Sequence, residues 1–206
     1  MEFMSTFEKT FSCALEQTQD LRYSQLFRDH INAIHRALEG LSSFEIRFRG
    51  MPELPIHCDF HPGNLRFSDE KCVGVLDFDW AKIDYRLFDV ALALVYFTSI
   101  WEKQGAGMKA DSFSFFLRNY NETCRRLPII SPLTRQEQRY LAPMISVANL
   151  YVLHWEAMDF LKSPRSDDDE HYMLINHTIG LLNWIAENEV DLEQWVKKSL
   201  RTSGPR

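Results

Sequence analysis

Side chains able to do chemistry gather in two short stretches of the sequence, residues 57–64 and residues 76–80. Within them, Asp59, Asn64 and Asp77 matter most. Transfer of a phosphoryl group needs a carboxylate that orients the attacking hydroxyl and accepts its proton, and oxygen ligands that hold Mg²⁺ against the phosphates of a nucleotide. Two carboxylates and an amide are suitable residue types for these two tasks, provided that they converge on one spot.

The segment between these two stretches predicts a β-hairpin that would bring them together. Residues 65–67 and 72–76 are short apolar runs, and residues 68–70 between them favour a turn. An antiparallel hairpin places the start of its first strand beside the end of its second strand. We therefore expect Asn64 and Asp77 to lie at the same end of the hairpin, where they can share a metal ion.

Each of these residues taken alone also has a structural interpretation. Asp59 could form a turn, and Asn64 could be a loop residue with a positive φ angle. Two carboxylates and an amide beside buried strands would be costly without a shared partner, which favours a functional interpretation for the three together. The neighbouring Asp79 could be a second acidic helper or a solvated side chain, and we favour the latter.

The rest of the chain has mostly helical patterns. Phe27, Ile31, Ile34 and Leu38 fall on one face of a helix, and Gly40 stands where helix C-termini are often capped. From residue 88 onward we expect helices over residues 89–103, 112–126, 134–161, 168–187 and 192–200, with Pro164 separating two of them. The predicted fold class is α+β and mostly helical, with chemistry at the loops around one small hairpin.

Composition and charge limit the classes of partner. The 206 residues are 45% hydrophobic, enough to bury a sizeable core in one domain or compact lobe. The formal net charge of -6 argues against a nucleic-acid partner, because phosphate backbones would be repelled. The longest apolar stretch, residues 87–101, is interrupted by Asp89 and falls short of the ~20 residues that span a bilayer, so we predict no membrane segment.

The cysteines indicate the compartment. They are scattered without a C-x-x-C pair, at Cys13, Cys58, Cys72 and Cys124. This pattern predicts neither a zinc knuckle nor a disulfide framework. Because the first residues also lack the pattern of a signal peptide, we expect a reducing, cytoplasmic setting.

The order of the motifs resembles a known family. The pattern His57-x-Asp59-x-x-x-x-Asn64, the hairpin, the apolar strand ending in Asp77 and the helix opened by Asp89 are similar to the catalytic loop and metal-binding segment of the aminoglycoside phosphotransferase and choline kinase superfamily. That superfamily is itself similar to the protein kinase fold. The resemblance implies that Asp59 is the catalytic base and that Asn64 and Asp77 bind Mg²⁺ and, through it, the nucleotide. It also implies that His57 holds the loop and that Asp89 accepts hydrogen bonds from the loop backbone.

The resemblance implies a kinase-like C-terminal lobe over residues 1–206, without the N-terminal lobe that would hold ATP. We expect a leading helix and linker over residues 23–53, the catalytic loop and hairpin over 54–80, and a helical subdomain over 87–200. Residues 1–53 contain neither a glycine-rich loop nor a strand lysine for the phosphates. A fragment of a longer kinase, a half completed by a second chain, and a degenerate kinase are the three explanations, and we favour the fragment.

The expected activity is ATP- and Mg²⁺-dependent transfer of the γ-phosphate to a hydroxyl of a small metabolite or an aminoglycoside-like compound. Glu156 and Asp159 on a later helix could attract a cationic acceptor, although we interpret both as solvated surface charges. One alternative is a metal-dependent hydrolase that binds zinc through His57, Asp59 and His61, whose spacing could place three ligands on one side of a loop. The other is a non-catalytic, kinase-like binding or scaffold protein.

Overall fold

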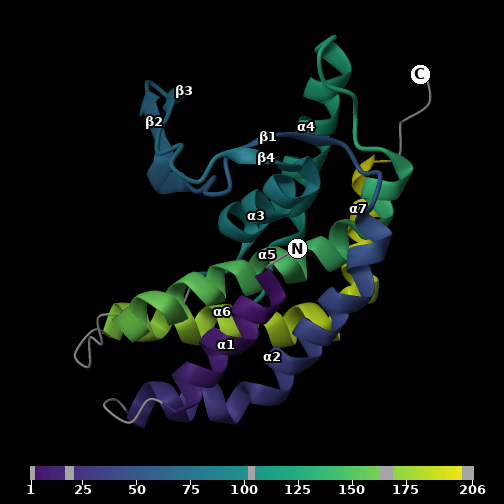
Figure 1. The fold of residues 1–206 in the computed structure, drawn as a ribbon. Helices are drawn as coiled ribbons and strands as arrows, with labels where there is room; N and C mark the ends of the chain where they lie inside the picture. Colours follow the sequence, from purple (N-terminus) through teal and green to yellow (C-terminus); the bar gives the residue numbers. More distant parts are fainter. Residues whose placement is uncertain (1–2, 17–20, 102–104, 163–168, 201–206) are drawn as a thin grey trace. The chain divides into compact units, whose positions relative to one another are not determined.

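A computed structural model describes residues 3–16, 21–101, 105–162 and 169–200 (Figure 1). The chain divides into two compact units. The first comprises Met1–Arg49, Trp101–Gly107 and Ser146–Glu187, and the second comprises Gly50–Ile100, Met108–Ile145 and Asn188–Arg206. Among the described residues, no helix combines the length and the apolar character needed to cross a membrane.

The first unit is built from helices around an aromatic core. It contains α1 (Phe3–Glu16), α2 (Leu21–Phe48), the later part of α5 (Arg135–Lys162) and α6 (Asp169–Glu187). The rings of Tyr23 and Phe160 stack with their centroids 4.2 Å apart, and both side chains are fully buried. The buried side chains that surround them come from α1, α2, α5 and α6 and include Phe7, Phe11, Phe27, Ile34, Leu38, Leu153, Ile175 and Ile179.

The predicted end of the leading helix is wrong. Helix α2 continues through Gly40 to Phe48, and the residue with a left-handed backbone is Gly50, whose φ is 85°. A glycine inside a helix costs only about 1 kcal/mol relative to alanine, so a helix whose later residues are held by packing can run through it. Phe48 is such a residue, since it is 1% exposed.

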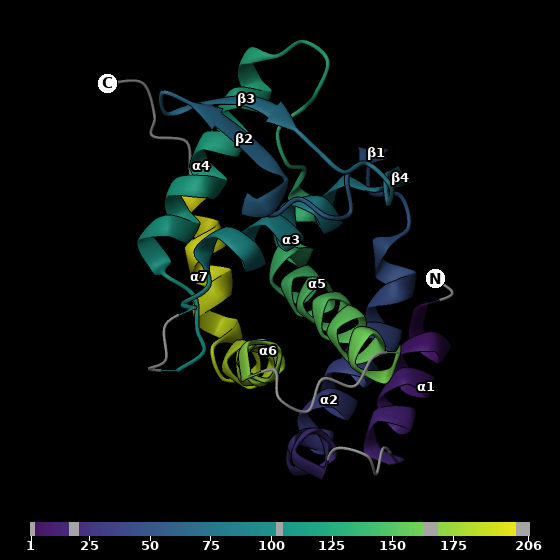
Figure 2. The same ribbon diagram turned by 90° about the vertical axis from the view of Figure 1, so that its left-hand side faces the viewer.

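The second unit contains two small antiparallel sheets and the candidate site. Strands β1 (Glu53–Ile56) and β4 (Lys82–Tyr85) form one sheet, and β2 (Leu65–Ser68) and β3 (Lys71–Val75) form the other. The β2–β3 pair is the predicted hairpin, with Leu65 opposite Val75, and it extends away from the β1–β4 sheet in Figure 2. Strands β1 and β4 were not predicted, because each is only four residues long and β1 contains Pro55, which cannot donate to a ladder.

Helices complete the second unit. They are α3 (Arg86–Thr98), α4 (Ala110–Arg126), the first part of α5, and α7 (Glu189–Leu200). Helix α4 packs on α7, where the rings of Phe113 and Trp195 meet edge to face at 5.6 Å. These elements confirm a mostly helical α+β fold with a small hairpin.

Two helix boundaries differ from the prediction. Helix α3 begins at Arg86, so Asp89 lies in its first turn, and it ends at Thr98. The extended residue that follows, Ser99, forms a bridge with Met108 instead of continuing the helix. The predicted break at Pro164 lies outside the described residues.

Candidate active site

Helix α3 holds the start of the candidate loop through one carboxylate. Asp89 Oδ2 accepts a hydrogen bond from the backbone N–H of His57 at 2.8 Å, and Asp89 Oδ1 accepts one from Cys58 N–H at 2.9 Å. Cys58 is 1% exposed and has a left-handed φ of 64°, which a non-glycine residue adopts only when its surroundings enforce it. The first turn of α3 therefore fixes the backbone of the loop that leads to Asp59.

His57 joins this loop to the end of strand β3. Its ring is buried, with the residue 7% exposed, and Nδ1 accepts a hydrogen bond from Asp59 N–H at 3.3 Å. Because Nδ1 is the acceptor, the neutral ring carries its proton on Nε2, which lies 2.8 Å from the carbonyl oxygen of Leu76. Both ring nitrogens of His57 thus face backbone groups.

Asp59 and Asn64 lie in direct contact. Asn64 Nδ2 donates to the backbone oxygen of Asp59 and to Asp59 Oδ2, both at 2.9 Å. Asn64 is 9% exposed, whereas the Asp59 side chain is 29% exposed. Since the amide nitrogen of Asn64 makes both bonds, its oxygen Oδ1 takes no part in them.

Asp77 follows directly after the residue that pairs with Asn64. Leu76 N–H donates to the backbone oxygen of Asn64 at 2.9 Å, which extends the hairpin by one pair beyond Leu65 and Val75. Asp77 is exposed and has a left-handed φ of 61°. Within the described part of the chain, no hydrogen bond or ion pair joins the Asp77 side chain to Asp59 or Asn64.

The donor set at this end of the hairpin fits a hard cation. The side-chain oxygens of Asn64 and Asp77 are the amide and carboxylate ligands that Mg²⁺ prefers. In contrast, the described residues contain no group of three or more histidine, cysteine, aspartate or glutamate side chains arranged to hold a metal. In the zinc-hydrolase alternative, one ring nitrogen of His57 would have to give up its backbone contact, with either Asp59 or Leu76, in order to bind the metal.

His61 has no predicted role in the leading interpretation, although the structure places it beside Asp59. His61 Nε2 lies 3.5 Å from Asp59 Oδ2, and its Nδ1 accepts a hydrogen bond from Gly63 N–H at 3.1 Å. The H-x-D-x-H spacing was visible in the sequence. The direction in which the ring points depends on Gly63 and could not be read from that spacing.

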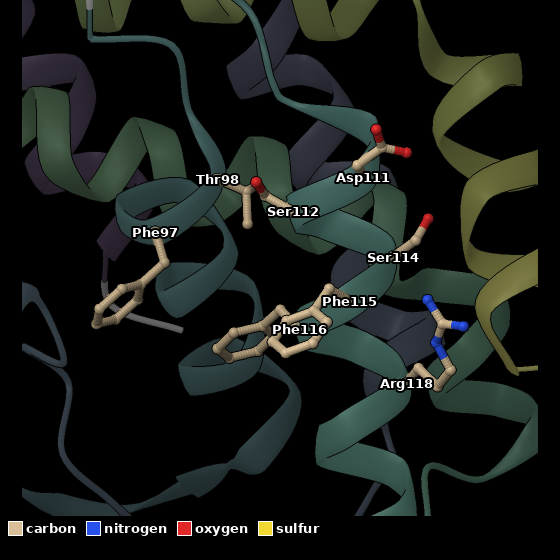
Figure 3. Close-up of a pocket in the computed structure, with 8 residues that line it drawn as sticks. All are labelled: Phe97, Thr98, Asp111, Ser112, Ser114, Phe115, Phe116 and Arg118. Carbon is tan, nitrogen blue, oxygen red and sulfur yellow. The ribbon is translucent and has the colours of Figure 1, made fainter. Parts of the chain in front are cut away.

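An open pocket of about 550 Å³ lies beside the end of α3 and the first turns of α4 (Figure 3). Its wall includes Phe97, Phe116, Asp111 and Arg118. The rings of Phe97 and Phe116 are 6.3 Å apart, and Phe97 lies 5.8 Å from Phe60, the residue after Asp59. Ring contacts therefore connect the pocket wall to the candidate loop.

The fold and the loop agree with those expected for a phosphotransferase. In keeping with this, the family model of the phosphotransferase enzyme family matches residues 9–123, more than half of the chain. The chain therefore belongs to the phosphotransferase enzyme family, which confirms the resemblance seen in the sequence.

Solved structures show the same fold. An ethanolamine kinase from Plasmodium vivax superposes with a TM-score of 0.57 and 15% identity, covering 92% of this chain and 50% of that one. A choline kinase from Cryptosporidium parvum gives a TM-score of 0.53 and 13% identity, covering 94% of this chain and 59% of that one. The chain thus spans between half and three fifths of these neighbours.

Two homoserine kinases are similar over a short segment. Those of Xanthobacter autotrophicus and Phenylobacterium zucineum are 44% and 41% identical to the chain over 46 residues. The matched segment is 22% of this chain and 14% of each relative.

Proposed function

We propose that the chain is the catalytic, metal-binding lobe of an ATP- and Mg²⁺-dependent enzyme that transfers the γ-phosphate to a hydroxyl of a small metabolite or an aminoglycoside-like compound. The observation that carries this proposal is the contact between Asn64 Nδ2 and Asp59 Oδ2 at 2.9 Å, in a chain of the phosphotransferase family. This contact fixes one carboxylate oxygen of Asp59 and leaves the other for a substrate.

In this mechanism Asp59 is the general base. Its second carboxylate oxygen, Oδ1, orients the acceptor hydroxyl and takes the proton as the hydroxyl oxygen bonds to the γ-phosphorus. The bond from that phosphorus to the bridging oxygen breaks, and the electron pair leaves with the nucleoside diphosphate. His57 and Asp89 keep the loop backbone in place during the reaction, through the bonds to Leu76 O and to the N–H groups of His57 and Cys58.

Asn64 and Asp77 are the residues that would hold Mg²⁺. When bound, the ion would neutralise negative charge on the phosphates. Asn64 is suited to link the two tasks, because its nitrogen orients Asp59 while its oxygen can serve as a ligand.

Replacing the base tests this proposal. Asp59→Asn keeps an oxygen that can accept from Asn64 Nδ2 but cannot take the proton, so kcat of the natural, full-length protein should fall by about 100-fold or more. Asp69→Asn is the matched control, because Asp69 is an exposed carboxylate in the hairpin turn whose φ of 46° asparagine tolerates. Phosphate transfer measured with both variants decides the matter, and unchanged kcat in Asp59→Asn would refute the proposed base.

We also propose that a second structural element, which would carry the nucleotide, packs against the hairpin region of this chain. Several large apolar side chains of the hairpin region are exposed, among them Phe67 at 61%, Val73 at 66% and Trp80 at 50%. An apolar surface of this kind is typical of a protein interface. The N-terminal lobe of a longer kinase, or a second chain, would cover it, and the chain by itself should then self-associate in light-scattering measurements unless Phe67 is replaced by serine.

The pocket beside α4 is a candidate binding site for a small acceptor molecule. Phe97 and Phe116 offer an apolar wall, and Asp111 offers a negative charge that suits an amine-bearing compound. We expect Asp111→Asn to raise KM for such an acceptor several-fold and to leave kcat unchanged. An unaltered KM for amine-bearing acceptors would place their binding elsewhere.

The proposed location is the cytoplasm. The cysteines that support it, Cys13, Cys58, Cys72 and Cys124, are all free thiols. Thiols persist in reducing compartments.

A further inference from the structure

His61 lies between Asp59 and Asn64 in the sequence, and its ring is held in a defined orientation. It precedes the short 3-10 turn Pro62–Asn64, and its Nδ1 accepts the hydrogen bond from Gly63 N–H at 3.1 Å. On another side, its ring lies 5.3 Å from the ring of Tyr96 on α3. The side chain is 32% exposed, so it borders both the loop and the solvent.

The hydrogen bond from Gly63 determines which nitrogen of the neutral ring carries the proton. Because Nδ1 accepts that bond, the proton lies on Nε2. Nε2 in turn is 3.5 Å from Asp59 Oδ2, the same oxygen that accepts from Asn64. This separation is longer than an ordinary N–H···O bond, and catalytic contacts of this kind often tighten when substrate binds.

Gly63 is required by the approach of this ring. A Cβ atom at residue 63 would lie 2.7 Å from Cε1 of His61, closer than real Cβ contacts, and 3.0 Å from Nδ1, so the ring would have to shift. The φ angle of Gly63 is not in the left-handed region, so the backbone itself would accept alanine. Because residue 63 has no side chain, the His61 ring can occupy this position, and a side chain there would displace it.

We propose that His61 positions Asp59, the base of phosphate transfer. This inference rests on the proposed function. The Nε2–H group of His61 and the Nδ2–H group of Asn64 converge on Asp59 Oδ2. Held in this way, the carboxylate presents Oδ1 to the acceptor hydroxyl. His61 keeps its proton throughout, and the proton of the hydroxyl moves to Asp59.

The competing explanation is that His61 only caps the 3-10 turn. That role uses Nδ1 alone, and asparagine at a cap position supplies an equivalent acceptor. The side chain of asparagine is too short to replace Nε2 as a donor to Asp59. His61→Asn therefore keeps the cap and removes the positioning contact, which separates the two explanations.

The kinetic test uses the natural, full-length protein with His61→Asn, Gly63→Ala and the double variant. We expect each single variant to lower kcat about 10-fold with KM values for both substrates within about 2-fold, since one hydrogen bond to a charged group is lost. The double variant should be no slower than His61→Asn, because Gly63 acts through His61. Wild-type kcat in His61→Asn, or additive losses in the double variant, would overturn the proposal.

An NMR measurement tests the contact without any phosphate transfer. In ¹⁵N-labelled protein, the His61 ring should show the form protonated on Nε2, and Gly63→Ala or Asp59→Asn should shift its ring resonances. A ring protonated on Nδ1, or one insensitive to both substitutions, would contradict the positioning contact. Failure of the proposed function has a different signature, namely unchanged phosphate transfer in Asp59→Asn while the ring resonances still respond.

Discussion

Helix α5 places one glutamate in each unit, Glu137 fully buried and Glu156 half-buried, and the surroundings of the two differ. Glu137, in the second unit, is fully buried and receives hydrogen bonds from Arg86 Nε at 2.6 Å and Arg86 Nη2 at 2.7 Å. Glu156, in the first unit, has a side chain that is 22% exposed, and its Oε2 lies 3.3 Å from Nδ1 of His171. A buried carboxylate with a matched guanidinium can stay charged, whereas one without it is driven toward its neutral form.

The pair of Arg86 and Glu137 also organises the loop before α5. Arg86 Nη1 donates to the backbone oxygen of Ser131 at 2.6 Å, and Nη2 donates to that of Pro132 at 3.0 Å. Thr134 N–H donates to Glu137 Oε2 at 2.7 Å. Arg86 opens the same helix α3 whose first turn holds the candidate loop through Asp89. The well-paired glutamate thus belongs to the framework beneath the site.

Removing the guanidinium should have the largest effect on stability. Arg86→Met would leave the Glu137 carboxylate buried and unpaired, and we expect the free energy of unfolding to fall by about 3–5 kcal/mol. Urea denaturation of both proteins measures this change. Arg126→Met is the control, because the pair of Arg126 with Glu122 is exposed and should change the unfolding free energy by less than about 1 kcal/mol. Equal effects of the two substitutions would break the comparison.

The less well-paired glutamate should make the first unit sensitive to pH. Burial, with a smaller effect from Asp159, raises the pKa of Glu156 from 4.5 to about 7. The folded chain therefore binds more protons than the unfolded chain between these values, and the free energy of unfolding decreases as pH rises through them. We expect a loss of roughly 2–3 kcal/mol between pH 4.5 and pH 8 that is absent in Glu156→Gln. Parallel pH profiles of the two proteins would contradict this.

The smallest expected effect concerns the neighbouring carboxylate. Asp159 is exposed and raises the pKa of Glu156 by like-charge repulsion. Asp159→Asn should move the pH at which stability is lost downward by a few tenths of a unit, since burial remains the larger cause. NMR titration of the Glu156 side chain would detect this shift in its pKa. If Asp159→Asn returned the pKa of Glu156 close to 4.5, repulsion by Asp159 and not burial would be the main cause.

Local sequence patterns predicted the parts of the site that local geometry determines. The hairpin follows from two apolar runs and a turn, and it brings the backbone of Asn64 beside Leu76. The phosphotransferase family was recognised from the spacing of His57, Asp59 and Asn64. These features depend on neighbours close in the sequence, where turn chemistry and strand alternation are strong signals.

Contacts between distant residues could not be predicted in the same way. Arg86 and Glu137 are 51 positions apart, and the Thr134-x-x-Glu137 capping box indicates where helix α5 starts but not which arginine pairs with Glu137. Glu156 and Asp159 were both expected to be solvated surface charges. Asp159 is exposed, whereas Glu156 is only half-buried and lies beside His171 of α6. The orientation of His61 likewise depends on the missing side chain of Gly63, a three-dimensional detail that residue types alone do not reveal.

The most direct test of the account is to locate the metal ion. Mn²⁺ added in place of Mg²⁺ with ATP should broaden the NMR signals of the Asn64 side-chain amide and of the Asp77 backbone in the natural protein. Asp77→Asn should weaken this broadening strongly. Broadening centred on another part of the chain, or unchanged in Asp77→Asn, would contradict the claim that this end of the hairpin holds the metal and the phosphate.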